Sequence, residues 1–207
     1  HVINKLNIEE RGSFLGEFEA DDKILIVQKS GVLQLINFDL SRHFNDDILL
    51  IEKWQKEKPL TAVYFDNAKD CYYVKRFLAV NNNKATSIIS DSKGSFLEII
   101  TSHPAPELDI SFVKERGKER KELKIILNDF IAVKGEKAQG NKLSSKKVHK
   151  LSLVEKEIEQ DQVLVEDSSS LLSDKKNESE AIENDTDSKT KIIIDENSTD
   201  NQFKLEL

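Results

Sequence analysis

The fold of this chain is limited most by a repeated pattern of paired β-rich runs, each pair separated by a turn signature. Residues 23–38 hold the first pair, with Lys29-Ser30-Gly31 between two runs rich in Ile, Leu and Val. Similar pairs flank the turn-forming residues 66–70, 91–94 and 114–122. Apolar and β-branched runs on both sides of such turns predict β-hairpins. Four hairpins along one chain predict an all-β fold.

The spacing of the hairpins indicates a propeller or barrel built from small sheets. A sandwich and two small barrels remain open as alternatives. Helical periodicity is scarce: residues 46–55 fit a helical turn or a short strand, and residues 151–162 fit a charged helix. A short apolar strand is expected at 130–133. None of these segments changes the predicted fold class.

Charge divides the chain into a mildly basic body and an acidic tail. Residues 1–150 carry 25 basic and 22 acidic side chains, whereas residues 151–207 carry 6 and 16. We therefore predict one β domain over 1–154 and a disordered acidic tail over 155–207, because the tail composition cannot bury enough apolar surface to fold. Two apolar islands in the tail, 192–194 and 203–207, are expected to be unstructured. The chain contains no methionine, and we interpret it as a piece of a longer protein.

Several classes of function find no support in the residues. The single Cys71 cannot form an internal disulfide, and the four histidines show no zinc-ligand spacing. A Walker-type phosphate loop is missing from the sequence, and no apolar run approaches the length that crosses a bilayer. We predict neither a catalytic nor a metal-binding residue in this chain, and no cofactor. These observations favour a binding domain.

The binding hypothesis depends on clustered cations. Residues 111–150 hold 12 basic and 5 acidic side chains. Within them, residues 129–144 form a loop with Gly135, Gly140 and three lysines. Glycine allows a backbone to turn sharply or approach a ligand, and lysines spaced along such a loop can reach successive phosphates.

Residues 129–144, together with 23–31, 38–44 and 60–77, resemble in the same order segments of one known family. It is the C-terminal DNA-binding domain of the type II topoisomerase A subunit (gyrase A or topoisomerase IV A), in its Bacteroides-group form. The resemblance implies a β-pinwheel of four-stranded blades whose basic rim binds and bends double-stranded DNA, with a first blade that is incomplete at the start of this chain. Residues 135–143 lack the paired arginines of the gyrase box, so relaxation and decatenation are expected rather than gyrase-type wrapping.

The same resemblance implies that the chain is a non-catalytic part of an ATP-hydrolysing enzyme. Cleavage in this class needs a tyrosine beside an arginine, and none of Tyr64, Tyr72 and Tyr73 follows an arginine. Mg²⁺ and ATP belong to the intact enzyme. The implied partners are double-stranded DNA, the remainder of the A subunit and the ATPase B subunit, in the cytoplasm at the nucleoid and without a membrane.

The candidate DNA contacts are the cations of the clusters and one amide. They are Lys29, Arg42, Lys75, Arg76, Arg116, Lys118, Arg120, Lys121, Lys124, Lys134, Lys137, Asn141, Lys142, Lys146 and Lys147. Such a set would contact phosphates rather than base edges. The alternative function is a protein-interaction propeller with a regulatory acidic tail, because repeated hairpins fit it equally well.

Overall fold

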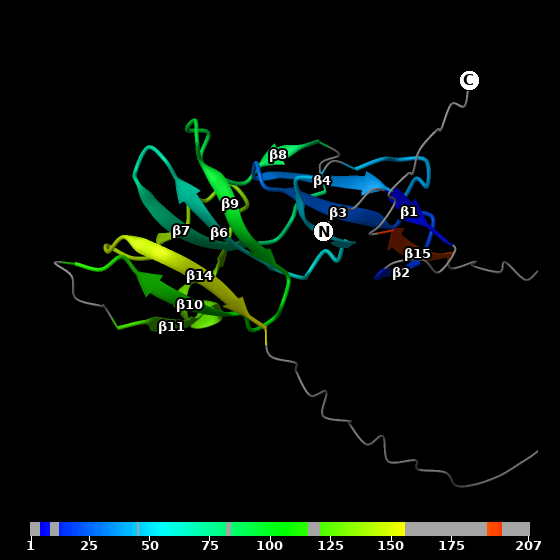
Figure 1. Ribbon diagram of the computed structural model, residues 1–207. Coiled ribbons are helices and arrows are strands. Elements are labelled where there is room, and N and C mark those ends of the chain that lie inside the picture. The colour runs from blue at the N-terminus through cyan, green and yellow to red at the C-terminus, as the bar shows by residue number, and fades with distance from the viewer. Residues whose placement is uncertain are drawn as a thin grey trace, which may run out of the picture.

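The computed structural model describes residues 5–8, 13–44, 46–81, 84–115, 121–155 and 190–195. These residues form antiparallel sheets with one short helix (Figure 1), so the predicted all-β class is confirmed. The radial arrangement of a pinwheel stays a prediction. No helix in the described part of the chain is both long and apolar enough to cross a membrane.

Four sheets follow one another along the chain. Sheet 1 contains β1 (Lys5–Asn7), β15 (Thr190–Asp195) and β2 (Ser13–Phe18), in that order. Sheet 2 contains β5 (Ile48–Lys53), β3 (Lys23–Gln28), β4 (Val32–Asn37) and β8 (Thr86–Ser87). Sheet 3 contains β9 (Phe96–Thr101), β6 (Leu60–Asp66) and β7 (Cys71–Phe77), with β12 (Val133–Lys134) and β13 (Asn141–Lys142) both paired to β7. Sheet 4 contains β14 (Val148–Val154), β10 (Glu107–Phe112) and β11 (Leu123–Ile126).

Three hydrophobic cores lie between successive sheets. Ile24 and Ile26 of β3 pack toward sheet 1, while Leu25 and Val27 of the same strand pack toward sheet 3. In β6, Tyr64 belongs to the core shared with sheet 2, and its neighbour Val63 to the core shared with sheet 4. Side chains alternate between the faces of a strand, so a sheet with a core on each side must be apolar on both. This explains the continuous apolar runs of β3 and β6.

One connection pattern recurs in the hairpin units. The β6–β7 hairpin is followed by β8, which pairs with β4 of the preceding sheet, and then by β9, which returns to pair with β6. The β10–β11 hairpin is followed by β12 and β13, which pair with β7 of the preceding sheet, and then by β14, which returns to β10. Each of these units therefore contributes a segment to the sheet before it.

This pattern corrects the third predicted hairpin. Strands do flank the turn at 91–94, but they are shorter than the predicted 86–90 and 95–102, and β8 pairs with β4 and β9 with β6. The turn at 91–94 therefore connects strands of two different sheets and not two strands that pair with each other. The hairpins at 29–31, 66–70 and 114–122 are confirmed by the β3–β4, β6–β7 and β10–β11 pairings.

Three local expectations change in the structure. Residues 46–55 contain β5, so the open choice between a helical turn and a strand is settled in favour of a strand. The strand expected at 130–133 is wrong: Leu127–Phe130 is α1, which places Leu127 and Ile131 in one core, and β12 starts only at Val133. The helix expected from residue 151 is also wrong within the described residues, because β14 pairs with β10 up to Val154.

The tail contributes one strand to the fold. Ile192, Ile193 and Ile194 were expected to be unstructured, but they lie in β15 between β1 and β2. Their side chains are almost completely buried. Pairing on both edges supplies the hydrogen bonds and apolar neighbours that an isolated island lacks. The other island, 203–207, lies outside the described residues.

Candidate nucleic-acid interface

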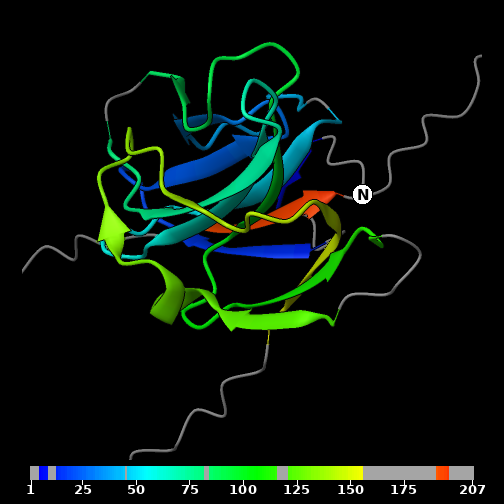
Figure 2. The ribbon, with the colours of Figure 1, turned by 90° about the vertical axis from the view of Figure 1, so that its left-hand side faces the viewer.

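The turns of sheets 2 and 3 and residues 113–115 at the end of β10 lie at one side of the molecule. They point to the left in Figure 1, and Figure 2 is seen from that side. Hydrogen bonds link these segments: the Lys29 oxygen accepts from the Leu97 amide at 2.9 Å, and the Asn67 side-chain amide donates to the Lys93 oxygen at 2.9 Å. We call this surface the turn rim and define it as residues 29–31, 66–70, 91–95, 113–115 and 144–147.

The last contact of the turn rim joins sheets 3 and 4. The Lys147 ammonium lies 3.0 Å from an Asp70 carboxylate oxygen, and the Lys147 backbone oxygen accepts from the Val113 amide at 3.0 Å. A single residue therefore touches the β6–β7 turn and the end of β10. These contacts connect the turns of sheets 2 and 3 and the end of β10 to one another or to neighbouring strands.

Cations are frequent on the turn rim. Lys29, Lys93 and Lys146 are exposed, and none of the described carboxylates lies within ion-pair distance of them. Lys69 lies 3.9 Å from the buried Asp66 carboxylate. Exposed ammonium groups without an internal counter-ion are the ones available to phosphate oxygens.

Residues 133–142, within the segment 129–144 that the sequence singled out, form a basic loop along the outer edge of β7. Val133 and Lys134 pair with Arg76 and Phe77, while Asn141 and Lys142 pair with Val74 and Tyr73. Lys134, Lys137 and Lys142 are exposed along this edge, with no described carboxylate at ion-pair distance. The Lys142 end lies toward the turn rim, because Tyr73 is close to the β6–β7 turn.

The two glycines of this loop differ in their roles. Gly140 has φ +89°, and a Cβ there would clash with the backbone oxygen of Val74. Only glycine allows this close approach, and the approach is to the backbone of β7 rather than to a ligand. Gly135 has nothing within 4 Å of an added Cβ, so the same explanation does not apply to it.

Lys75 is buried, whereas a lysine that contacts DNA must be exposed. It is 3% exposed, and its ammonium donates to the backbone oxygens of Ile88 at 2.8 Å and Glu136 at 2.5 Å. Burial lowers the pKa of Lys75 to about 8, although the nearby Glu136 carboxylate raises it. Its neighbour Arg76 is half-buried, and burial lowers the pKa of its guanidinium too. Lys75 thus positions the basic loop instead of presenting its charge to solvent.

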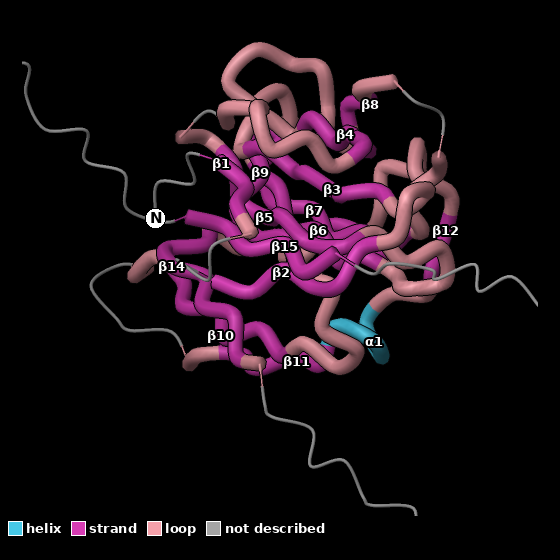
Figure 3. The backbone as a smooth tube through the Cα atoms, turned by 90° about the vertical axis from the view of Figure 1, so that its right-hand side faces the viewer, coloured by secondary structure: helices cyan, strands magenta, loops and turns pink. Residues whose placement is uncertain are grey.

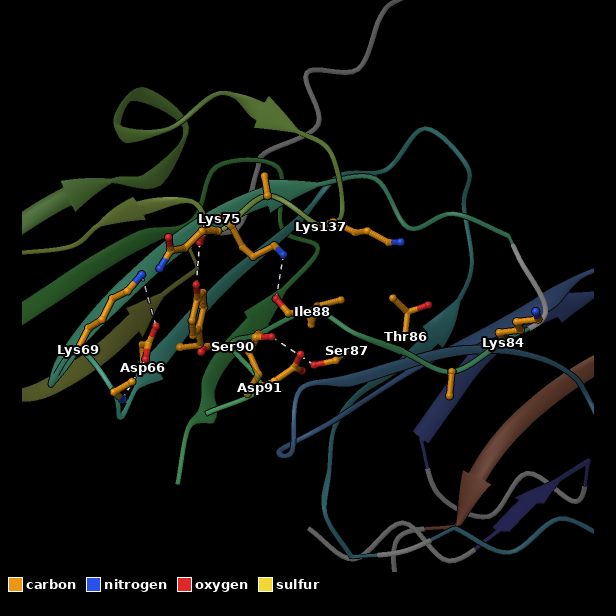
Figure 4. Close-up of a pocket in the computed structure, with 16 residues that line it drawn as sticks. Asp66, Lys69, Lys75, Lys84, Thr86, Ser87, Ile88, Ser90, Asp91 and Lys137 are labelled. Carbon is orange, nitrogen blue, oxygen red and sulfur yellow. Dashed lines mark hydrogen bonds and ion pairs between the residues drawn. The ribbon is translucent and has the colours of Figure 1, made fainter. Parts of the chain in front are cut away.

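A cavity of about 730 Å³ lies beside Lys75, between the segment 84–91 and the basic loop. Figure 4 shows Lys75 reaching toward Ile88, with Lys137 on the wall above and Asp66 and Lys69 paired at one side. The Tyr64 hydroxyl donates to the Gln139 oxygen at 2.8 Å, which fixes the loop from below. Tyr64 is buried, and burial raises the pKa of its hydroxyl. The cavity therefore separates the loop from the segment 84–91, while hydrogen bonds from Lys75 and Tyr64 hold the loop in place.

The remaining candidates do not gather at one place. Arg42 lies in the exposed connection between β4 and β5, Lys121 is exposed just before β11, and Lys124 of β11 forms an ion pair with Asp109 at 3.2 Å. The Asn141 side chain is directed to the Phe130 oxygen at 3.4 Å. Three candidates lie outside the described residues: Arg116, Lys118 and Arg120.

Lys69 and Lys93 are among the cations of the turn rim that sequence reasoning missed. Both stand in turns that the sequence identified, yet neither belongs to a local cluster of basic residues. The recurring turn signature could have identified both lysines, because the turns of neighbouring sheets lie at the same side of the molecule. Local charge density was the wrong criterion for them.

Comparison with known proteins agrees with this architecture. A family profile described as topoisomerase C-terminal domain matches residues 5–156, which is well over half of the chain. The protein therefore carries a topoisomerase C-terminal domain. It belongs to the form of this family described for Bacteroidota, which confirms the resemblance stated from the sequence. No curated protein and no solved structure matched the chain.

Proposed function

We propose that this domain binds double-stranded DNA along the turn rim and the adjoining basic loop, as a non-catalytic part of a type II topoisomerase A subunit. Topoisomerases act on DNA, and the family assignment supports DNA as the partner. The observation that carries the proposal is that the turns of sheets 2 and 3 and the end of β10 lie at one lysine-bearing surface. The proposed contacts are Lys29, Lys93, Lys134, Lys137, Lys142 and Lys146. Lys75 is not among them, because its ammonium is buried.

The proposed contacts are lysines on turns and loop edges, so they bind phosphate oxygens and follow the shape of the duplex. This form of contact carries little base specificity and favours DNA that bends easily. The domain positions a DNA segment beside the part of the intact enzyme that cleaves and passes strands. Positioning of this kind contributes to reaction rate without any group transfer by the domain itself.

The activity proposed for the intact enzyme is ATP-dependent relaxation and decatenation. The basic loop carries single lysines and no arginine pair, which argues against tight gyrase-type wrapping. Mg²⁺, ATP and the cleaving tyrosine are assigned to the remainder of the A subunit and to the ATPase B subunit.

A salt titration tests the proposal. Anisotropy of a labelled linear duplex is measured with the full chain at increasing salt. If about six phosphates are engaged, affinity falls on the order of 10³-fold between about 50 and 200 mM salt, and unrelated duplexes of equal length bind alike. Absence of binding at low salt, or binding that ignores salt, would contradict a phosphate-contacting surface and favour the protein-interaction alternative.

A further inference from the structure

Strand β15 is the only link between the two other strands of sheet 1 within the described residues. It pairs antiparallel with β1 on one edge and with β2 on the other, and no described pairing joins β1 to β2. Figure 3 shows β15 between its two neighbours, and Figure 1 shows the same order from another side. Sheet 1 therefore exists as a sheet because a segment from residues 190–195 enters it.

The side chains of β15 fill the space that this position offers. Ile192 is 0% exposed and Ile194 5%. Both belong to the core that includes Leu6, Phe18 and Ile24. Ile193 alternates to the opposite face and is also buried. A strand with both edges paired and both faces covered is held as a central strand, although it is distant in sequence from both of its neighbours.

The backbone conformation of β2 matches the register in which β15 pairs with it. The pairing register shifts between Ile192 and Ile193, where β2 places Gly16 and Phe14 opposite them. Gly16 has φ +142°, a conformation that L side chains rarely adopt, while an added Cβ would meet only ordinary contacts at 3.7 Å. The bulge thus fixes which residue of the guest strand stands at which position of β2.

We propose that the slot between β1 and β2 is a strand-binding site whose ligand is the segment Thr190–Asp195 of the same chain, bound as a separable peptide. Residues 155–189 separate this ligand from β14 in the sequence. The strand is therefore not placed beside β1 and β2 by a short covalent connection. The class of ligand is an extended peptide with three consecutive β-branched apolar side chains. Recognition combines backbone pairing on two edges with side-chain pockets, as in other cases of strand addition. This inference is independent of the proposed DNA binding.

The experiment uses the intact chain with a protease site introduced between residues 165 and 180. After cleavage, the fragment that contains β15 is expected to stay with the body in gel filtration. A labelled peptide of residues 188–197 is expected to replace it, with saturable one-to-one binding. Separation of the fragment with no change in the thermal stability of the body would overturn the proposal. Failure of a large peptide excess to replace the fragment would equally overturn it, because the strand would then be permanently fixed.

Two altered peptides make the test specific. Ile192→Asp places a carboxylate in the shared core and is expected to weaken binding at least about tenfold. Lys191→Ala changes an exposed side chain and is expected to leave the affinity within about twofold. Equal affinities of the two peptides would show that the pockets play no part. Co-purification of two differently tagged intact chains would assign the slot to a second copy and would overturn the intramolecular arrangement.

Discussion

The ammonium of Lys75 donates a hydrogen bond to the backbone oxygen of Glu136 at 2.5 Å, so a buried cation fixes the middle of the basic loop. A second bond from the same ammonium, to the Ile88 oxygen at 2.8 Å, ties the loop to the segment after β8. The basic loop is thus held in place by a charge that is itself buried.

Lys75 should give the folding stability a measurable pH dependence. Its folded pKa of about 8 lies below the ordinary value of 10.5. Below pH 8, burial of the charged ammonium therefore lowers the free energy of unfolding by its full amount. This penalty disappears as the pH rises toward 10.5, because the unfolded chain binds more protons than the folded protein in that interval. The stability of the protein relative to Lys75→Met should increase by up to about 3 kcal/mol over that interval. Urea unfolding of both proteins at several pH values measures the difference; parallel curves would contradict it.

Gly140→Ala should destabilise the domain by at least about 2 kcal/mol, because the new methyl group meets the Val74 oxygen and φ is positive. The matched control is Gly135→Ala, where an added Cβ has open space. That change should stay within about 1 kcal/mol of the parent protein and can raise stability by reducing the entropy of the unfolded chain. Thermal unfolding of the pair measures both effects. Similar destabilisation of both variants would mean that the approach of the loop to β7 is not what requires glycine.

Removal of a lysine from the turn rim should weaken DNA binding and flatten its salt dependence. Lys93→Gln and Lys29→Gln each remove one of the proposed phosphate contacts, so each should lower the slope of log affinity against log salt by about 1. Lys56→Gln is the control, since Lys56 is exposed in the connection between β5 and β6, at the opposite ends of these strands from the turns. Anisotropy titrations at three salt concentrations compare the variants. An effect as large for Lys56→Gln as for Lys93→Gln would remove the turn rim as the binding surface.

The acidic tail should compete with DNA for the basic surface. The sequence predicts that deletion of residues 155–207 strengthens binding, because a tethered polyanion acts at high local concentration. That deletion also removes β15, so its effect on folding would be mixed with its effect on charge. Exchange of the acidic residues in 155–189 for Asn and Gln keeps the strand and isolates the charge. Binding should then strengthen at low salt and approach that of the parent protein at high salt; unchanged binding at low salt argues against competition.

Sequence reasoning predicted the elements whose signal is local. The three hairpins with a turn signature between two apolar runs were confirmed, because both strands and the turn are encoded in adjacent residues. The partners of β8 and β15 were missed because they are decided by contacts between distant parts of the chain. The helix α1 was missed because Leu127 and Ile131 lie one helical turn apart within a run that also reads as a strand.

The candidate site was predicted less completely than the fold. Clustering of basic residues found the loop along β7, since its lysines are close in sequence. The same criterion included Lys75, which is buried because alternation along β7 directs it inward, and omitted Lys93, which reaches the turn rim only after folding. Charge density in a sequence therefore identifies segments, whereas placement of single charges requires the sheet register.

The pairing of later strands with an earlier sheet has a consequence for how such a domain grows. A cut between β5 and β6 would deprive sheet 2 of β8, and a cut between β9 and β10 would deprive sheet 3 of β12 and β13. A repeat that is added or deleted during evolution must therefore include the segment that pairs with the preceding sheet. The final unit has no successor within the described residues, and the outer edge of β11 is bare, with Leu123 and Ile126 exposed. By the same pattern, an additional repeat after Val154 would pair the segment that follows its hairpin with this edge.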